Sequence, residues 1–95
     1  MSKSILQTDR ECYLCGGQNI LDEHHVFGAA NRKKSEKYGL KVYLCHDSCH
    51  IFGKNSVHQN ATVNNALQVK AQKKAMEHYG WSVDDFRNIF GKNYL

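Results

Sequence analysis

The stretch "CYLCGG", residues 12–17, decides how this chain of 95 residues can fold. Cys12 and Cys15 have two residues between them and two glycines after them. This is the pattern of a zinc knuckle, a tight turn with a thiolate on either side. Twenty-nine residues separate this pair from a second one, Cys45 and Cys49. Because so small a domain buries little of its surface, we expect a bound metal or disulfides to add stability. The pairs predict one structural four-cysteine zinc site that supplies folding energy, with two disulfides or free core thiols as the alternative.

The segment before the first knuckle bears on the compartment. It holds no apolar run of signal-peptide length, and no segment of the chain approaches the roughly 20 apolar residues that span a bilayer. We therefore expect a cytoplasmic location and no membrane partner. In reducing surroundings paired cysteines are more often metal ligands than disulfides, which favours zinc. His46, inside the second pair, is a further candidate ligand, although a surface position is the simpler expectation.

Positive charge is concentrated in one segment of this moderately basic chain, whose net charge is +4 and whose pI is about 8.9. Between residues 32 and 41 a single acid, Glu36, faces five bases: Arg32, Lys33, Lys34, Lys37 and Lys41. Such a run is most often a solvated loop. The alternative is a patch that contacts nucleic-acid phosphates, for which the candidates are Arg32, Lys33, Lys34 and Lys37.

The remaining pattern predicts a small α+β fold. Residues 20–27 and 40–45 are predicted strands, antiparallel and joined by an extended basic loop over 28–39, with Leu40, Val42 and Leu44 on one face. Residues 62–79 form a predicted helix that Gly80 ends, and a shorter helix follows, with Ser82 as N-cap and Gly91 as its stop. We expect a single domain over 1–95, with a zinc-braced core at 1–61 and a helical C-terminal extension at 62–95.

Two of the six histidines lie between the cysteine pairs, and another follows the second pair directly. "LDEHHVFG", residues 21–28, places His24 and His25 side by side, and His50 directly follows Cys49. This arrangement resembles the HNH family of nucleases, the zinc-stapled branch of the ββα-metal (His-Me finger) fold, whose members read C-x2-C, an Asp-His or His-His pair followed by Ile or Val, then L-C-x2-C-H. The resemblance covers about residues 12–50 and extends more loosely to 58. "ECYLCGGQN", "GLKVYLC" and "FGKNYL" are also similar to small HNH-like proteins of phages.

The resemblance implies a ββα-metal core braced by the four cysteines and an endonuclease that hydrolyses DNA phosphodiester bonds. It implies that His25 is the general base that activates water. It implies that His24 and His50 bind a catalytic divalent ion, Mg2+ or another such as Mn2+ or Ni2+, and that His58 is a further ligand. A neutral imidazole can take the proton of water, and the ion can stabilise the leaving oxygen.

The acids beside the histidine pair have separate expected roles. Adjacent strand residues point to opposite faces, so His24 and His25 can serve one site only if the strand ends there, and Gly28 makes that ending plausible. Asp22 is expected to orient His24 or to join the metal, and Glu23 is expected to be a solvated carboxylate.

Two departures from the family pattern also stand in the sequence. The second cysteine pair has three intervening residues where the family has two, and the family's middle Asn is missing. Asn31 is the nearest substitute for that residue, although an ordinary loop asparagine explains it as well.

Three functions compete for this pattern. The first is a metal-dependent endonuclease with DNA as its partner, which the histidine pair favours. The second is a non-cleaving zinc-dependent nucleic-acid-binding module of the same fold, which the missing Asn favours. The third is a protein-interaction module whose C-terminal helices dock on a partner. So small a chain is also compatible with work inside a larger phage, packaging, recombination or repair assembly.

Overall fold

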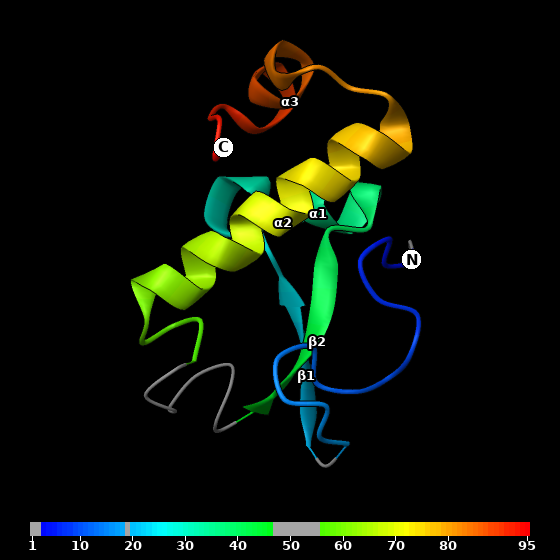
Figure 1. Ribbon diagram of the computed structural model, residues 1–95, viewed down its shortest axis with the longest axis vertical. Helices are drawn as coiled ribbons and strands as arrows, with labels where there is room; N and C mark the ends of the chain where they lie inside the picture. Colours follow the sequence, from blue (N-terminus) through cyan, green and yellow to red (C-terminus); the bar gives the residue numbers. More distant parts are fainter. Residues whose placement is uncertain (1–2, 19, 47–55) are drawn as a thin grey trace.

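The computed structural model describes residues 3–18, 20–46 and 56–95 (Figure 1). It is a small α+β structure with one two-stranded sheet. In chain order its elements are β1 (Leu21–His25), the 3-10 helix η1 (Ala29–Asn31), α1 (Arg32–Tyr38), β2 (Lys41–Cys45), α2 (Ala61–Tyr79) and α3 (Val83–Phe90). No helix among the described residues combines the length and apolar character needed to cross a membrane.

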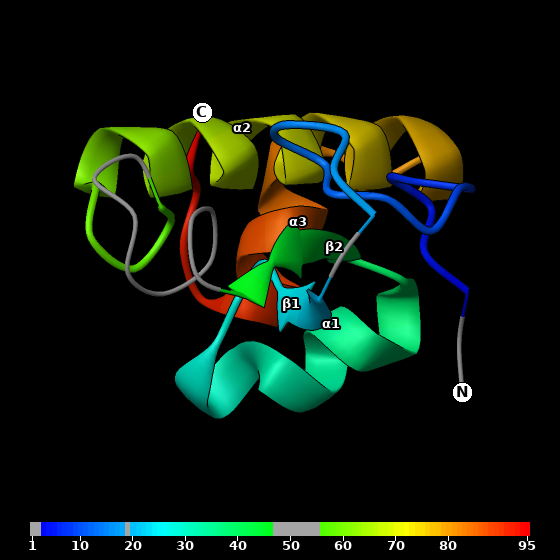
Figure 2. The same cartoon turned by 90° about the horizontal axis from the view of Figure 1, so that it is seen from below.

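The two strands form the antiparallel pair that the sequence predicts. Leu21 lies opposite Cys45, and His25 lies opposite Lys41. Leu40, Val42 and Leu44 are buried, as expected for residues that share one face of a strand. The sheet lies between two helices, with α2 on one side and α1 on the other (Figure 2). Each strand therefore presents alternate side chains to different helices.

The segment between the strands is not the extended loop that the sequence predicted. Residues 29–31 form η1 and residues 32–38 form α1. Arg, Lys and Glu are good helix formers. The high charge of the segment favoured the prediction of a solvated loop, although these residue types also favour a helix. Gly39 ends α1 in the left-handed conformation, with φ of 72°, and its N–H donates to carbonyls of the last turn. The basic residues consequently lie on a helix.

Ser35 attaches α1 to the chain directly after β1. Its side chain is fully buried. The Oγ atom accepts a hydrogen bond from the Phe27 N–H at 3.1 Å and donates one to the Phe27 carbonyl at 2.7 Å. Both backbone groups of a buried residue are thereby satisfied. This contact fixes the position of α1 relative to the end of β1.

The C-terminal helices begin and end at the residues that their capping signals indicate. The Asn60 side chain caps α2 by accepting from the N–H groups of Thr62 and Val63. Ser82 and Asp85 form a reciprocal capping box at the start of α3. Gly80 and Gly91 end the two helices with φ of 69° and 83°. The predicted helices are thus confirmed, with α2 beginning one residue earlier.

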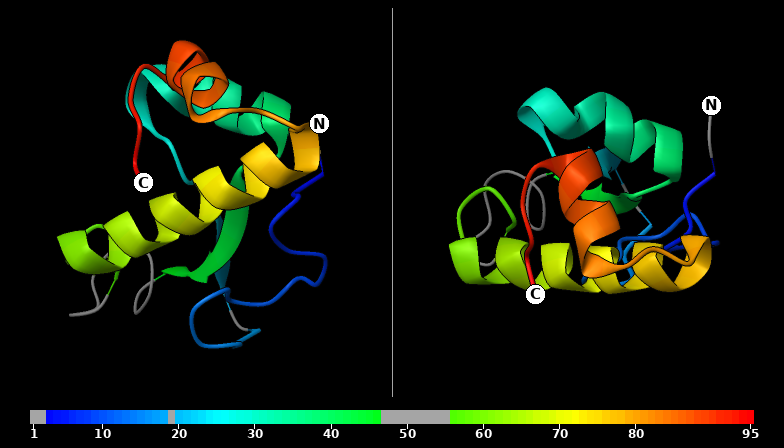
Figure 3. Two further views of the ribbon diagram at one scale, coloured as in Figure 1. Left: turned by 45° about the horizontal axis from the view of Figure 1, so that its top comes forward. Right: turned by 90° about the horizontal axis from the view of Figure 1, so that it is seen from above.

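An aromatic cluster joins these helices to the rest of the fold. The ring centroid of Phe27 lies 5.4 Å from that of Phe86, 5.0 Å from that of Phe90 and 4.9 Å from that of Tyr94. Figure 3 shows α3 beside both α1 and α2. The residues before and after position 61 therefore share one hydrophobic core.

The N-terminal segment covers the other edge of β2. Its Ile5 N–H donates to the Gly39 carbonyl at 2.9 Å, and its Tyr13 N–H donates to the Tyr43 carbonyl at 2.8 Å. The Gln7 side chain accepts from the Tyr43 N–H at 2.9 Å. These hydrogen bonds satisfy an edge that would otherwise be open. They also bring the first cysteine pair to the end of β2.

Candidate functional site

Three cysteines meet where the N-terminal segment reaches β2. The sulfur atoms of Cys12, Cys15 and Cys45 all lie within 4.8 Å of one another, and none of the three forms a disulfide. Cys15 and Cys45 are 3.3 Å apart at Sγ. The Cys12 N–H donates to the Gly17 carbonyl at 2.8 Å, which closes the predicted knuckle. The three sulfurs are close enough to bind a metal such as zinc, while Cys49 lies outside the described residues.

The surroundings of this cluster suit a cation. Burial raises the pKa of the Cys12 thiol, but backbone N–H groups that donate to its sulfur, those of Cys45 and Cys15 among them, outweigh burial and lower the pKa to about 6. The neighbouring Cys15 thiol and burial raise the pKa of Cys45 to about 11. A divalent ion would supply the positive charge that lets all the sulfurs ionise.

Gly17 provides the space for such an ion. A Cβ atom at this position would lie 3.2 Å from the Cys45 sulfur and 3.5 Å from the Cys15 sulfur. Any larger residue would press on the ligands from one side. The glycine after the first pair therefore leaves space beside the Cys15 and Cys45 sulfurs.

His46 points to a different partner. The Nδ1 atom of His46 lies 2.6 Å from Oδ2 of Asp22. His46 is not part of the cluster of Cys12, Cys15 and Cys45. Asp22 was expected to orient His24 or to join the catalytic metal. Its carboxylate contacts His46 across the end of the sheet.

A cavity of about 390 Å³ brings together three of the four candidate histidines, His24, His25 and His58. We call it the histidine cavity; its lining includes His24, His25 and His58, the basic residue Arg32, and Asn64 and Gln68 of α2. The ring centroids of His24 and His58 are 5.7 Å apart, in an edge-to-face arrangement. His24 is 8 % exposed. His50, the other predicted ligand, lies outside the described residues.

The two adjacent histidines reach one cavity from opposite faces of the sheet. His24 lies opposite Val42 and contacts His58, whereas His25 lies opposite Lys41 and contacts Glu36 of α1. Strand β1 ends at His25, two residues before the predicted end at Phe27, which meets the condition for both histidines to serve one site. Both rings can therefore line the space beyond the strand end.

His25 sits in a network of charges. Its Nε2 atom lies 3.3 Å from Oε1 of Glu36 and 3.9 Å from Oε1 of Glu23. The Lys41 ammonium lies 2.6 Å from Oε2 of Glu36 and 3.5 Å from Oε1 of Glu23. The hydrogen bond from Lys41 holds the pKa of Glu36 below its usual value. Burial lowers the pKa of Lys41, but the two carboxylates outweigh burial and raise it.

Glu23 is exposed, as expected of a solvated carboxylate, and it also forms an ion pair with Lys41. One expectation is wrong in this network. Lys41, counted with the basic segment, has a side chain only 6 % exposed, because alternation turns it toward the two acids and away from solvent. The side chains of Glu23, His25 and Glu36 offer ligand atoms within 4.8 Å of one another. The Lys41 ammonium already compensates these carboxylates, so this group is better described as an ion-pair network than as a metal site.

The first residues of the basic segment lie near the histidine cavity and near the C-terminal end of α3. Arg32 lines the histidine cavity, and Lys33 is exposed. Lys34 donates to the Ile89 carbonyl at 2.5 Å, and the Asn31 amide donates to the Phe90 carbonyl at 2.9 Å. These two contacts satisfy the C-terminal end of α3. The Asn31 amide, the nearest substitute for the family's middle Asn, thus bonds to α3.

The last predicted phosphate contact, Lys37, lies at the other end of α1. Its ammonium is 5.3 Å from the centroid of the Tyr38 ring. It is exposed, as the basic-patch reading requires.

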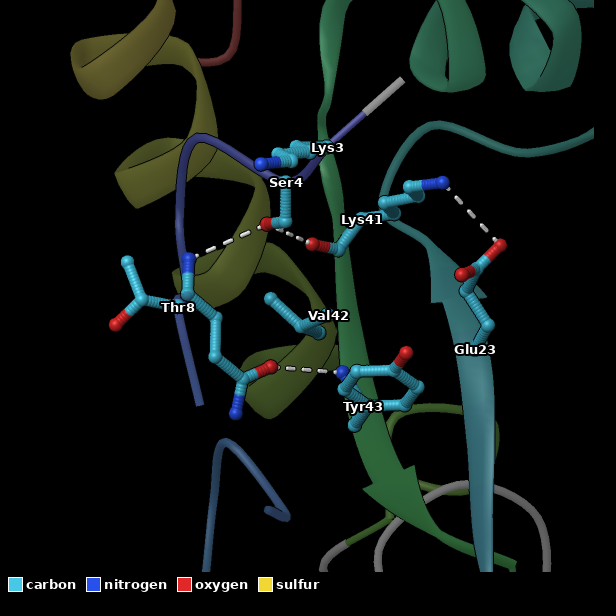
Figure 4. A pocket seen from close by; sticks show the side chains of 8 residues that line it. Lys3, Ser4, Thr8, Glu23, Lys41, Val42 and Tyr43 are labelled. Atoms are coloured by element: carbon cyan, nitrogen blue, oxygen red, sulfur yellow. Dashed lines mark hydrogen bonds and ion pairs between the residues drawn. The ribbon is translucent and has the colours of Figure 1, made fainter. Parts of the chain in front are cut away.

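A larger cavity of about 500 Å³ lies between the N-terminal segment and the sheet. Figure 4 shows Ser4 and Thr8 on one side of it and Tyr43 of β2 on the other, with the Glu23–Lys41 ion pair at its border. Among the described residues that line it, none is a histidine or a cysteine. The described candidate histidines therefore line the histidine cavity and not this larger one.

Sequence reasoning did not single out three residues near that cavity: Glu36, Asn64 and Gln68. Glu36 was visible as the lone acid in the basic segment. Asn64 and Gln68 are four positions apart, which places them on one helix face, but spacing alone does not show what that face contacts.

Comparison of this chain with protein-family models, curated proteins and solved structures found no match.

Proposed function

We propose that this chain is a metal-dependent endonuclease of the HNH type, with a ββα-metal core, that hydrolyses DNA phosphodiester bonds. The observation that carries the proposal is the histidine cavity, which brings His24, His25, His58 and Arg32 to one space of about 390 Å³. Imidazoles beside a guanidinium match the needs of phosphodiester hydrolysis: a proton acceptor, metal ligands and a phosphate contact. The resemblance of "LDEHHVFG" to the HNH motif is independent support.

His25 is the general base in this proposal. When Nε2 donates its proton to the Glu36 carboxylate, Nδ1 is left as the basic nitrogen that takes the proton of the attacking water. A carboxylate that accepts from the far nitrogen of a catalytic imidazole fixes both its tautomer and its orientation. Glu36 would thereby be the residue that positions the base.

His24 and His58 are the described candidates for the catalytic ion, with His50 as the third predicted ligand. Bound there, Mg2+, Mn2+ or Ni2+ would stabilise charge on the phosphate and the leaving oxygen. The edge-to-face arrangement of His24 and His58, with ring centroids 5.7 Å apart, is compatible with two ligands of one ion.

The basic segment would hold the substrate. Arg32 is the cation at the cavity and is suited to a bidentate phosphate contact. Lys33 and Lys37 are exposed on α1 and would extend that contact along the backbone. Backbone contacts position DNA but do not read its sequence.

The cysteine cluster has a structural role in this proposal. Cys12, Cys15 and Cys45 would hold zinc together with Cys49, so four thiolates would leave the ion no open position for substrate. The zinc would anchor the N-terminal segment to β2.

A plasmid assay tests the activity. Supercoiled plasmid is incubated with the full chain in Mg2+, Mn2+ or Ni2+, and the nicked and linear forms are quantified. We expect His25→Ala to cut at least about 100-fold more slowly, the size of a typical general-base contribution. His78→Ala is the matched control, because His78 is exposed in the last turn of α2. If wild-type protein never cuts, the nuclease proposal fails, and equal rates for wild type and His25→Ala would remove His25 as base.

A non-cleaving nucleic-acid-binding module of the same fold is the second candidate. It is favoured by the Asn31 amide, which is bonded to Phe90, so the nearest substitute for the family's Asn is occupied at α3. This function predicts DNA that is retarded in a gel but stays intact in every metal. Retarded and nicked DNA together would exclude it.

A further inference from the structure

The α2 side of the histidine cavity is lined by two amide side chains, Asn64 and Gln68. They are four residues apart in a continuous helix, so they occupy the same face on successive turns. Both are half-buried. The cavity therefore has a neutral polar wall in addition to its imidazoles and Arg32.

Among the described residues, these two amides differ from the other buried or half-buried amide side chains in having no side-chain hydrogen bond. The Asn31 amide donates to Phe90, and the Gln72 amide bonds to Asn93 and Tyr94. Within residues 3–18, 20–46 and 56–95, no side-chain hydrogen bond joins Asn64 or Gln68 to another residue. A half-buried amide has lost part of its contact with water, so a ligand that restores those hydrogen bonds is favoured.

The hydrogen-bonding groups of an amide match the edge of a DNA base better than they match a phosphate. An amide presents a donor and an acceptor, and the edge of a base does the same, whereas a phosphate only accepts. Asn and Gln form bidentate pairs with the N6 and N7 atoms of adenine. Arg32, a cation with donors only, is the phosphate contact in the same cavity. The volume of about 390 Å³ falls in the usual range for ligand sites, ~300–1,000 Å³.

We propose that Asn64 and Gln68 bind the edge of a base next to the phosphate at the histidine cavity, and that they give the protein a base preference that the backbone contacts cannot supply. The proposal rests on the proposed function, since it takes DNA as the ligand of that cavity. It adds a specificity determinant on α2, outside the segment that resembles the HNH motif. Adenine is the base whose edge fits the two amides best.

The test has a binding arm that does not depend on cleavage. Labelled 12-bp DNA duplexes that differ in one base pair are titrated with the zinc-loaded full chain without added Mg2+, Mn2+ or Ni2+, so that the structural zinc is kept and cleavage is not supported. We expect wild type to prefer one base by about tenfold, the size of one good bidentate pair, and Asn64→Ala or Gln68→Ala to lose most of that preference. Asn65→Ala and Gln59→Ala are matched controls, because both residues are exposed and neither lines the cavity.

A cleavage arm separates base recognition from metal binding. A plasmid library is cut in Mn2+, and the bases around the cut sites are sequenced for each variant. We expect the two cavity variants to keep the same Mn2+ dependence while their cut sites become random. The proposal is overturned if wild type shows no base preference in binding, if the variants retain it, or if they shift the Mn2+ concentration needed for cleavage. Absent cleavage by wild type refutes the nuclease proposal alone, because the binding arm still decides the role of the amides.

Discussion

Two serines among the described residues are fully buried, but the hydroxyl group of one is hydrogen-bonded and that of the other is not. Substituting each serine by alanine removes the same hydroxyl group from these two environments. Ser35 and Ser56 are both 0 % exposed. The Ser35 Oγ bonds to the N–H and the carbonyl of Phe27, whereas the Ser56 Oγ has no hydrogen-bond partner within the described residues. Ser35→Ala and Ser56→Ala should therefore change the free energy of unfolding in different directions.

The magnitude follows from the groups that lose their partners. Ser35→Ala leaves two backbone groups of buried Phe27 unsatisfied, at about 1–3 kcal/mol each, so we expect a loss of roughly 2–6 kcal/mol. For a domain of this size each kcal/mol lost lowers the melting temperature by about 4–8 °C. Ser56→Ala removes a buried hydroxyl without a partner, so it should leave stability within about 1 kcal/mol of wild type, on the stabilising side.

Guanidinium unfolding followed by circular dichroism measures the difference, with zinc saturating in every sample. Equal denaturant slopes for the three proteins make their midpoints comparable. Equal stability of Ser35→Ala and Ser56→Ala would refute the reasoning, since both lose one buried oxygen. Because α1 also carries Glu36 and Arg32, Ser35→Ala should lower any nicking rate even where it remains folded.

Two further predictions concern the charge network and the cysteine cluster. The pKa of Glu36 is lowered from 4.5, so the carboxylate stabilises the fold above that pH, and this contribution is lost as the pH falls through the folded-state value. The difference in unfolding free energy between wild type and Glu36→Gln should shrink in that acid window, and a constant difference would contradict the role of the charge. For the cluster, elemental analysis should find about one zinc per chain in wild type. Gly17→Ala should weaken zinc affinity in a competitive chelator titration, because its Cβ would lie 3.2 Å from the Cys45 sulfur, whereas a Cβ at Gly28 meets nothing within 4 Å. Equal zinc affinity of Gly17→Ala and Gly28→Ala would exclude metal binding against Gly17.

Much of the fold was accessible from the sequence because its signals are local. The caps of α2 and α3 lie within four residues of the groups they satisfy, so Ser82, Gly80 and Gly91 could be read directly. The alternation of Leu40, Val42 and Leu44 identified a buried face in the same way. The cysteine spacing indicated the knuckle, since a turn of that length brings its two thiols together.

The candidate site depended on contacts that no local pattern encodes. The partner of Asn31 is Phe90, 59 residues away, and the partner of His25 is a carboxylate on a helix that was predicted to be a loop. Lys41 is basic in sequence but lies buried between two acids in the structure. Local hydrogen bonding determines where helices and strands begin and end. Only the packing of those elements determines which side chains share a cavity and therefore which charges compensate one another.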